Sequence, residues 1–316
     1  MSSKRITQQT PAAFAVIAAS STDGSNSASS AASPLTVAAP PPVSPPVALA
    51  TPSHSTPLPR PRKTETREVR SLRRANALAA EGQIDRALEH LRKLILAVPG
   101  SLRGRIRLAT LLREKNRSTE ALEVLRAAVQ SAPRSLQPRE MLSELCLESG
   151  RWDEAIEQCR VLLSLSPNSL AARDVLSAAH LQRGHLEKAL RVIDEMIRLD
   201  PHDAGNHFKR GVLLQQMGNV GGAVTAFERA LEMAPDSEAA EESRTALEML
   251  DNYQIRQVIT LAVEDLGFRV QLRRDSNRAV AGKGFILSSS GLSALSQMRF
   301  DDLPDAPPGW RHLFYH

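Results

Sequence analysis

The sequence is short of aromatic residues, of cysteine and of long apolar runs. Aromatic side chains make up 3% of its 316 residues, and there are only two cysteines. No apolar run reaches the length of about 18 residues that a membrane-spanning helix needs, so we expect no membrane span. The apolar stretch PAAFAVIAAS is short, and polar residues separate it from Lys4 and Arg5, which argues against a secretory signal. We therefore expect a cytoplasmic protein.

Motifs of catalysis are missing as well. The chain has no phosphate-binding G-x-x-x-x-G-K-[ST], no metalloprotease H-E-x-x-H and no nucleophile elbow G-x-S-x-G. His180 and His185 are five residues apart and so do not share a helical face, and two cysteines alone make no zinc site. The sequence predicts a protein without enzymatic activity, cofactor or metal ion.

Residues 1–67 differ in composition from the rest of the chain. They hold 11 of the 20 prolines and one aromatic residue, Phe14, so they cannot bury enough apolar surface to offset chain entropy. We predict a disordered tail over 1–67. It supplies four of the five net positive charges, mostly in the run PRPRKTETR. Because this run has neither interleaved aromatic residues nor a groove-reading motif, the sequence argues against nucleic-acid binding.

Five prolines recur at a spacing of 34 residues, each closing an apolar pattern of helical period: Pro99, Pro133, Pro167, Pro201 and Pro235. Twelve residues before each of them stands an alanine, and seventeen residues before stands a glycine, with Asn116 as the single exception. Glycine and asparagine tolerate the left-handed backbone with which a helix ends, and proline cannot continue a helix. This register predicts five helical hairpins between residues 68 and 237.

Small and large residues occupy fixed places in these hairpins. Small residues let the paired helices approach closely: Ala75, Ala109, Ser143, Ser177 and Gly211. Large residues form the predicted core seam: Leu78, Leu112, Cys146, His180 and Leu214 on the first helices, with Leu91, Leu125, Cys159, Ile193 and Phe227 on the second. We interpret the histidine and the two cysteines as buried side chains, with a disulfide or a metal pair as the alternative for the cysteines.

This pattern resembles the tetratricopeptide repeat (TPR), and GRWDEAIEQC at 150–159 is similar to the helix-to-helix turn of that family. The resemblance implies an all-α fold, a right-handed solenoid of five repeats over 68–101, 102–135, 136–169, 170–203 and 204–237. A capping helix over 238–251 completes the predicted solenoid domain, 68–251, because the last repeat needs a cover for its apolar face.

In the resembled family, the first helices line a concave groove that binds an extended peptide or a helix of a partner protein. Projecting the first helices onto such a groove gives ten candidate residues: Asn76, Arg103, Thr110, Arg113, Gln137, Glu140, Glu144, Asp174, Phe208 and Gln215. Their charges change from basic to acidic along the groove, although the same residues could form a solvated face. The Lys/Asn/Arg clamp for chaperone tails is missing, because only Asn76 fits it.

Beyond the cap, residues 252–299 predict a module of four small helices. Its sequence resembles the helical leader region of some bacterial peptide-natural-product precursors, and the matching residues are Glu264, Phe268, Arg269, Leu272, Asp275, Ala279, Ala281, Gly284, Leu287, Ser288, Ala294 and Leu295. That resemblance implies a docking module for a modifying enzyme, and the alternative is a helical appendage that extends the solenoid. In a flexible tail over 300–316, Trp310, Phe314 and Tyr315 could anchor a partner or fold back on the solenoid.

The sequence thus predicts a non-enzymatic scaffold that binds a partner polypeptide in the groove of a TPR solenoid. The alternative is a carrier or substrate protein whose C-terminal module is recognised by a peptide-modifying enzyme. Self-association into homo-oligomers could accompany either function.

Overall fold

The computed structural model of the chain describes residues 66–303, and within this range the regular elements are fourteen α-helices and one 3₁₀ turn, with no strand. The predicted disordered tail falls outside the described residues, except for Thr66 and Arg67, which cap and begin the first helix. The three aromatic residues of the C-terminal tail, Trp310, Phe314 and Tyr315, also lie outside the described range.

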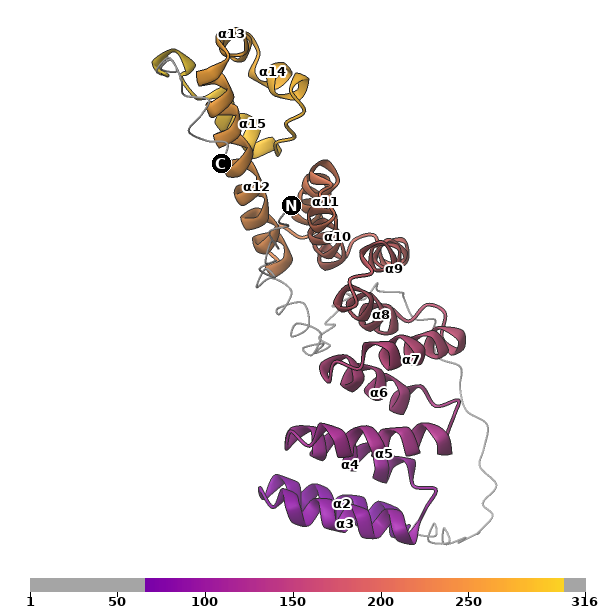
Figure 1. Ribbon diagram of the computed structural model, residues 1–316. Helices are drawn as coiled ribbons and strands as arrows, with labels where there is room; N and C mark the ends of the chain where they lie inside the picture. The colour runs from indigo at the N-terminus through magenta and orange to yellow at the C-terminus, as the bar shows by residue number, and fades with distance from the viewer. Residues whose placement is uncertain (1–65, 304–316) are drawn as a thin grey trace, which may run out of the picture.

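Ten helices form five antiparallel hairpins that stack in chain order (Figure 1). The hairpins are α2 (Arg67–Ala80) with α3 (Ile84–Ala97), α4 (Leu102–Glu114) with α5 (Ser118–Ser131), α6 (Leu136–Glu148) with α7 (Trp152–Leu165), α8 (Leu170–Gln182) with α9 (Leu186–Leu199), and α10 (Ala204–Gln216) with α11 (Val220–Met233). The predicted all-α solenoid of five repeats is confirmed.

The turn inside each hairpin has the backbone that the sequence register requires. Asn116 has a φ of 57°, and the glycines at the four equivalent turns have φ between 70° and 77°. In the second hairpin, the backbone N–H of Arg117 donates to the carbonyl of Leu112 at 2.8 Å, and the equivalent bond closes the other four turns. A left-handed residue therefore ends each first helix and sends the chain back along it.

All ten predicted seam residues are buried, and they pack between the paired helices. Both cysteines are free, and burial raises the pKa of the Cys146 and Cys159 thiols to about 12. The fifth repeat departs from the others because Phe227 fills its seam, and its ring lies against the backbone of Gly211. A Cβ on Gly211 would lie 2.5 Å from Phe227 Cε1, so the larger ring requires the smaller residue.

The capping helix differs from its prediction. α12 runs without a break over Glu238–Glu264, so the prediction that a cap ends at 251 and that a separate helix follows is wrong. The physical reason is that neither glycine nor proline occurs between Ser237 and Asp265 to end the helix. The first half of α12 covers the fifth repeat, where Leu247 is buried, while its second half belongs to the C-terminal module.

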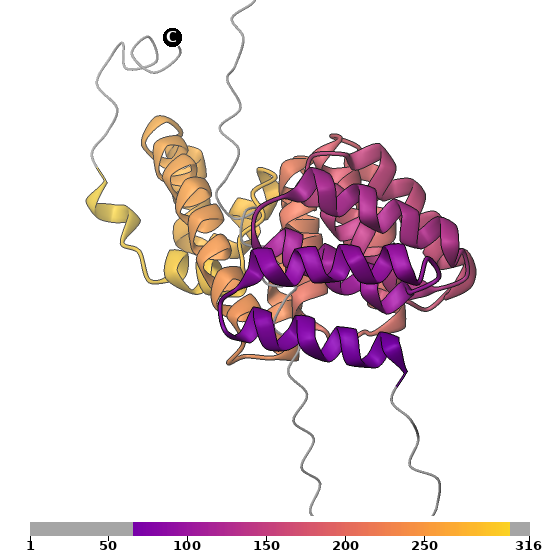
Figure 2. The same cartoon turned by 90° about the horizontal axis from the view of Figure 1, so that it is seen from below.

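The C-terminal module packs α13 (Leu266–Arg274), α14 (Ser276–Gly282) and α15 (Ser289–Ser296) against the second half of α12. The 3₁₀ turn η2 (Phe300–Asp302) follows, and Phe300 is buried in the core of the module. Figure 1 places the module at the end of the stack opposite α2 and α3, and Figure 2, seen from below, shows it to one side of the stacked hairpins. Of the residues that resemble a leader region, seven are buried in the described structure, so the module's own packing accounts for much of that pattern.

Buried polar contacts hold the module to α12. The Asp251 carboxylate accepts hydrogen bonds from the backbone N–H of Ser288, at 2.8 Å, and from the Ser288 hydroxyl. Ser288 also caps α15. The Gln254 amide pairs with the backbone of Ile286 in both directions, at 2.8 and 2.6 Å. Since Ser289 also donates to Glu228 of α11, the module is joined to the fifth repeat as well.

Candidate binding groove

A hollow of about 820 Å³ lies along the inner side of the last four repeats. We call it the inner groove. Its wall comes mainly from the first helices α4, α6, α8 and α10, together with the start of α12. Four of the ten residues predicted from the sequence line it: Arg113, Glu144, Asp174 and Phe208. The structure therefore brings together residues that stand up to 95 positions apart in the chain.

The other six predicted residues do not line the inner groove: Asn76, Arg103, Thr110, Gln137, Glu140 and Gln215. Two of them are engaged in contacts of their own. The Asn76 side-chain oxygen accepts a hydrogen bond from Arg107 Nε at 2.7 Å, and the Thr110 hydroxyl donates to the carbonyl of Ile106 at 3.0 Å. A binding role for all ten residues stays a prediction.

Both cations of the inner groove are paired with carboxylates. Arg113 contacts Glu148 directly, and its guanidinium lies 3.8 Å from Glu144. Lys209 on α10 pairs with Asp174 on α8. Arg113 is therefore already paired across the α4–α6 contact, and a change from basic to acidic along the groove stays a prediction.

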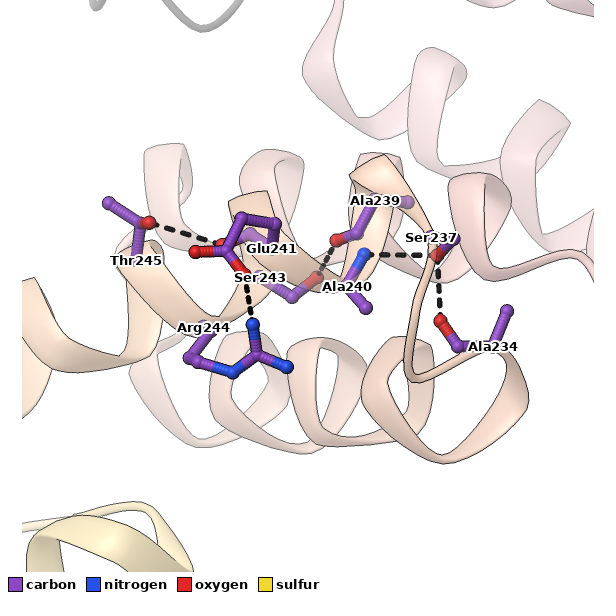
Figure 3. Close-up of polar contacts among 8 residues, drawn as sticks. All are labelled: Ala234, Ser237, Ala239, Ala240, Glu241, Ser243, Arg244 and Thr245. Carbon is purple, nitrogen blue, oxygen red and sulfur yellow. Dashed lines mark hydrogen bonds and ion pairs between the residues drawn. The ribbon is translucent and has the colours of Figure 1, made fainter.

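Two carboxylates of the inner groove have raised pKa values. Burial raises the pKa of Glu144 above its usual range, Glu148 and Glu140 raise it further, and Arg113 opposes them. Burial also raises the pKa of Glu242, with a further contribution from Glu238. Figure 3 shows the first turns of α12, where Ser237 caps the helix and Arg244 pairs with Glu241 rather than with either groove carboxylate.

Sequence reasoning missed several residues of the inner groove, notably Trp152, Asn206, Glu238 and Glu242. Glu238 and Glu242 were missed because the projection used only the first helices of the repeats, while the start of the cap closes one end of the hollow. Asn206 gave no signal, since an asparagine in the first turn of a helix usually faces solvent. In the structure it is 1% exposed, and its Nδ2 has no hydrogen-bond partner.

The histidine pair lies away from the inner groove. His180 is buried, its ring centroid is 5.9 Å from that of His185, and burial lowers the pKa of His180 below its usual value, helped by the positive charge of Lys188. Among residues 66–303, no group of three or more His, Cys, Asp or Glu side chains is placed to hold a metal ion. Not one of the helices in the described range combines the length and the apolar character needed to cross a bilayer.

Comparisons with known proteins agree with this fold. Family models described as tetratricopeptide repeat match residues 72–135, 106–170 and 176–248. Among solved structures, MamA 41-end from Desulfovibrio magneticus RS-1 is similar over 55% of this chain and 99% of that chain, with 15% identity and a TM-score of 0.50.

Two further solved structures are similar. The MamA RS-1 ArsTM double mutant has 16% identity and a TM-score of 0.50, over 55% of this chain and 100% of that chain. YrrB, described as a TPR protein with an unusual peptide-binding site, has 18% identity and a TM-score of 0.49, over 58% of this chain and 94% of that chain. A comparison with curated protein sequences finds no match. At these identities, the likeness concerns the fold alone.

Proposed function

Because the chain belongs to the tetratricopeptide-repeat family, we propose that it is a non-enzymatic scaffold and that it binds a partner polypeptide in the inner groove. The observation that carries this proposal is the hollow of about 820 Å³ along the first helices. Its volume lies in the range of sites that enclose a ligand, about 300–1,000 Å³.

The wall of the inner groove suits a peptide. Leu147 and Val175 are partly exposed and give the wall of the hollow apolar surface, and buried Phe208 lies in the same wall. Burying one Leu-sized or Phe-sized side chain of a partner there would contribute about 1.5–3 kcal/mol. Carboxylates and amides at the edge can position the partner's polar groups, and the lining has no Ser, Thr, Cys or His that could act as a nucleophile. We therefore infer that this wall binds a partner.

Blocking the inner groove tests this proposal. Ala171 on α8 lines the hollow and is exposed, so Ala171→Trp fills the groove without entering the core. Ala127 on α5 is exposed and lies outside the hollow, and Ala127→Trp is the matched control. The full-length protein and both variants are used to capture proteins from a lysate of the source organism. We expect the wild type and Ala127→Trp to retain the same partner and Ala171→Trp to lose it, with unchanged melting temperatures.

Retention of the same proteins by Ala171→Trp would contradict binding in the inner groove. Loss of the partner by both variants would also contradict it, because the effect would then not depend on the hollow. Quantitative mass spectrometry of the captured proteins distinguishes these outcomes.

A further inference from the structure

The inner groove has an excess of negative charge. Two cations line it, Arg113 and Lys209, against six carboxylates: Glu144, Glu148, Asp174, Asp203, Glu238 and Glu242. Both cations are already paired with carboxylates of the same wall. The charge that remains toward the hollow is therefore negative.

Four of these six carboxylates come from rows of acidic residues on two helices, which we call ladders: Glu144 and Glu148 on α6, and Glu238 and Glu242 on α12. On α6, Glu140, Glu144 and Glu148 follow one another at intervals of four residues, and on α12 Glu238 and Glu242 do the same. Like charges at this spacing lie on one helical face and destabilise the helix. A ligand with the opposite charge would relieve this repulsion.

The ladder on α12 is the less compensated of the two. Arg113 faces the α6 ladder, whereas the nearest cation on α12, Arg244, pairs with Glu241 (Figure 3). No positive group of the described chain lowers the pKa of Glu242, which burial and Glu238 raise. Removing the carboxylate of Glu242 from water without a partner is unfavourable, so this position is ready to accept a cation.

The size and lining of the inner groove point to a peptide rather than to a free ion. The hollow of about 820 Å³ is lined by residues of several helices, and its wall includes the partly exposed apolar side chains of Leu147 and Val175. A single ion would leave this apolar surface uncovered. A peptide can cover it with an apolar side chain while its charged side chains meet the carboxylates.

We propose that the partner segment is a cationic peptide, with Lys or Arg side chains that pair with the carboxylates of α6 and α12 and with an apolar side chain seated between them. This inference rests on the proposed function, since it assigns the chemistry of the ligand of the same groove. The charged pairs would fix the position of the peptide, and the apolar side chains of the wall would supply contact area.

Selection from a random peptide library tests the charge preference. Phage that display random 12-residue peptides are selected on the full-length protein, with the blocked variant Ala171→Trp as counter-selection. We expect peptides enriched in Lys and Arg around an apolar residue. Groove-dependent peptides that are acidic or without charge preference would overturn the inference and leave the proposed function standing. Absence of groove-dependent peptides would contradict both.

Charge reversal then locates the contact. In the variant Glu238→Lys with Glu242→Lys, we expect a selected cationic peptide to bind at least about tenfold more weakly at low salt, with a smaller difference at high salt. The matched control is Glu123→Lys with Glu187→Lys, which reverses the same number of charges at exposed positions outside the hollow, one of them also in the first turn of a helix. Equal affinity of the peptide for both double variants, measured by fluorescence anisotropy, would overturn the inference.

Discussion

The pairing of Gly211 with Phe227 allows a quantitative test of how the fifth repeat is packed. In Gly211→Ala, the new Cβ would lie 2.5 and 2.6 Å from two ring carbons of Phe227, which is closer than atoms can pack. The ring is fully buried and cannot move into solvent. We expect overpacking to cost about 1–3 kcal/mol, against a gain of about 1 kcal/mol from the better helix propensity of alanine. The net change should be a destabilisation of about 1 kcal/mol.

A second substitution, Phe227→Leu, tests the same contact from the side of the ring. The first two repeats carry Ala and Leu at the equivalent places, as Ala75 with Leu91 and Ala109 with Leu125. Phe227→Leu alone should lower the free energy of unfolding by about 1 kcal/mol, because it leaves a cavity over Gly211. In the double variant the alanine fills that space, so we expect the double variant to be more stable than the sum of the single changes predicts.

The assay is urea unfolding followed by circular dichroism, analysed as a double-mutant cycle. We expect a favourable coupling of about 1–2 kcal/mol between the two sites. Because repeat proteins can unfold in parts, we compare the urea concentration at the midpoint of the transition that includes α10 and α11. The comparison requires the same m-value, the dependence of the unfolding free energy on urea concentration, in all variants. Additive effects of the two substitutions, or a stabilising Gly211→Ala, would refute the packing argument.

Three further predictions concern other buried polar groups. The lowered pKa of His180 means that its contribution to stability is full above the unfolded pKa of about 6.5 and is lost as the pH drops toward the lower folded value. His180→Leu introduces the residue found at three of the four equivalent seam places. It should flatten the dependence of the melting temperature on pH between about pH 7 and 5, and an unchanged dependence would contradict this. Ser288→Ala should lower the free energy of unfolding of the C-terminal module by about 1–3 kcal/mol, because it leaves an oxygen of buried Asp251 without its hydrogen-bond donor. Hydrogen exchange of the α15 amides should then be faster than in the wild type, and an unchanged exchange rate would contradict this prediction. Since the pKa of both Cys146 and Cys159 is about 12, native protein should not react with a thiol reagent at pH 8, whereas urea-unfolded protein should react at both sites.

The repeat register could be predicted from the sequence because each of its signals has a local cause. Asn116 in place of a glycine, with its φ of 57°, and the evenly spaced prolines require only the backbone preferences of single residues. The seam residues followed from helical periodicity, since packing partners stand at fixed distances in every hairpin. For this reason the five hairpins agree with the structure.

The end of the solenoid could not be predicted in the same way. The absence of glycine and proline between Ser237 and Asp265 allows one continuous helix, but nothing in this segment shows that its second half joins another module. That placement depends on contacts of Asp251 and Gln254 with Ser288 and Ile286, which lie far along the chain.

The inner groove was predicted only in part for a similar reason. Its shape depends on how successive repeats are placed, so Arg113 and Glu144 were found, while Glu238 on the cap was not. Such contacts between distant segments leave no pattern in the local sequence.

Hydrogen–deuterium exchange of the full-length protein, with and without a peptide selected on it, tests the central claim most directly. We predict slower exchange in α6, α8, α10 and the first turns of α12 when the peptide is bound, and unchanged exchange in α5 and α11, which contribute no residue to the inner groove. Slower exchange confined to α5, α11 or the C-terminal module would contradict binding in the inner groove.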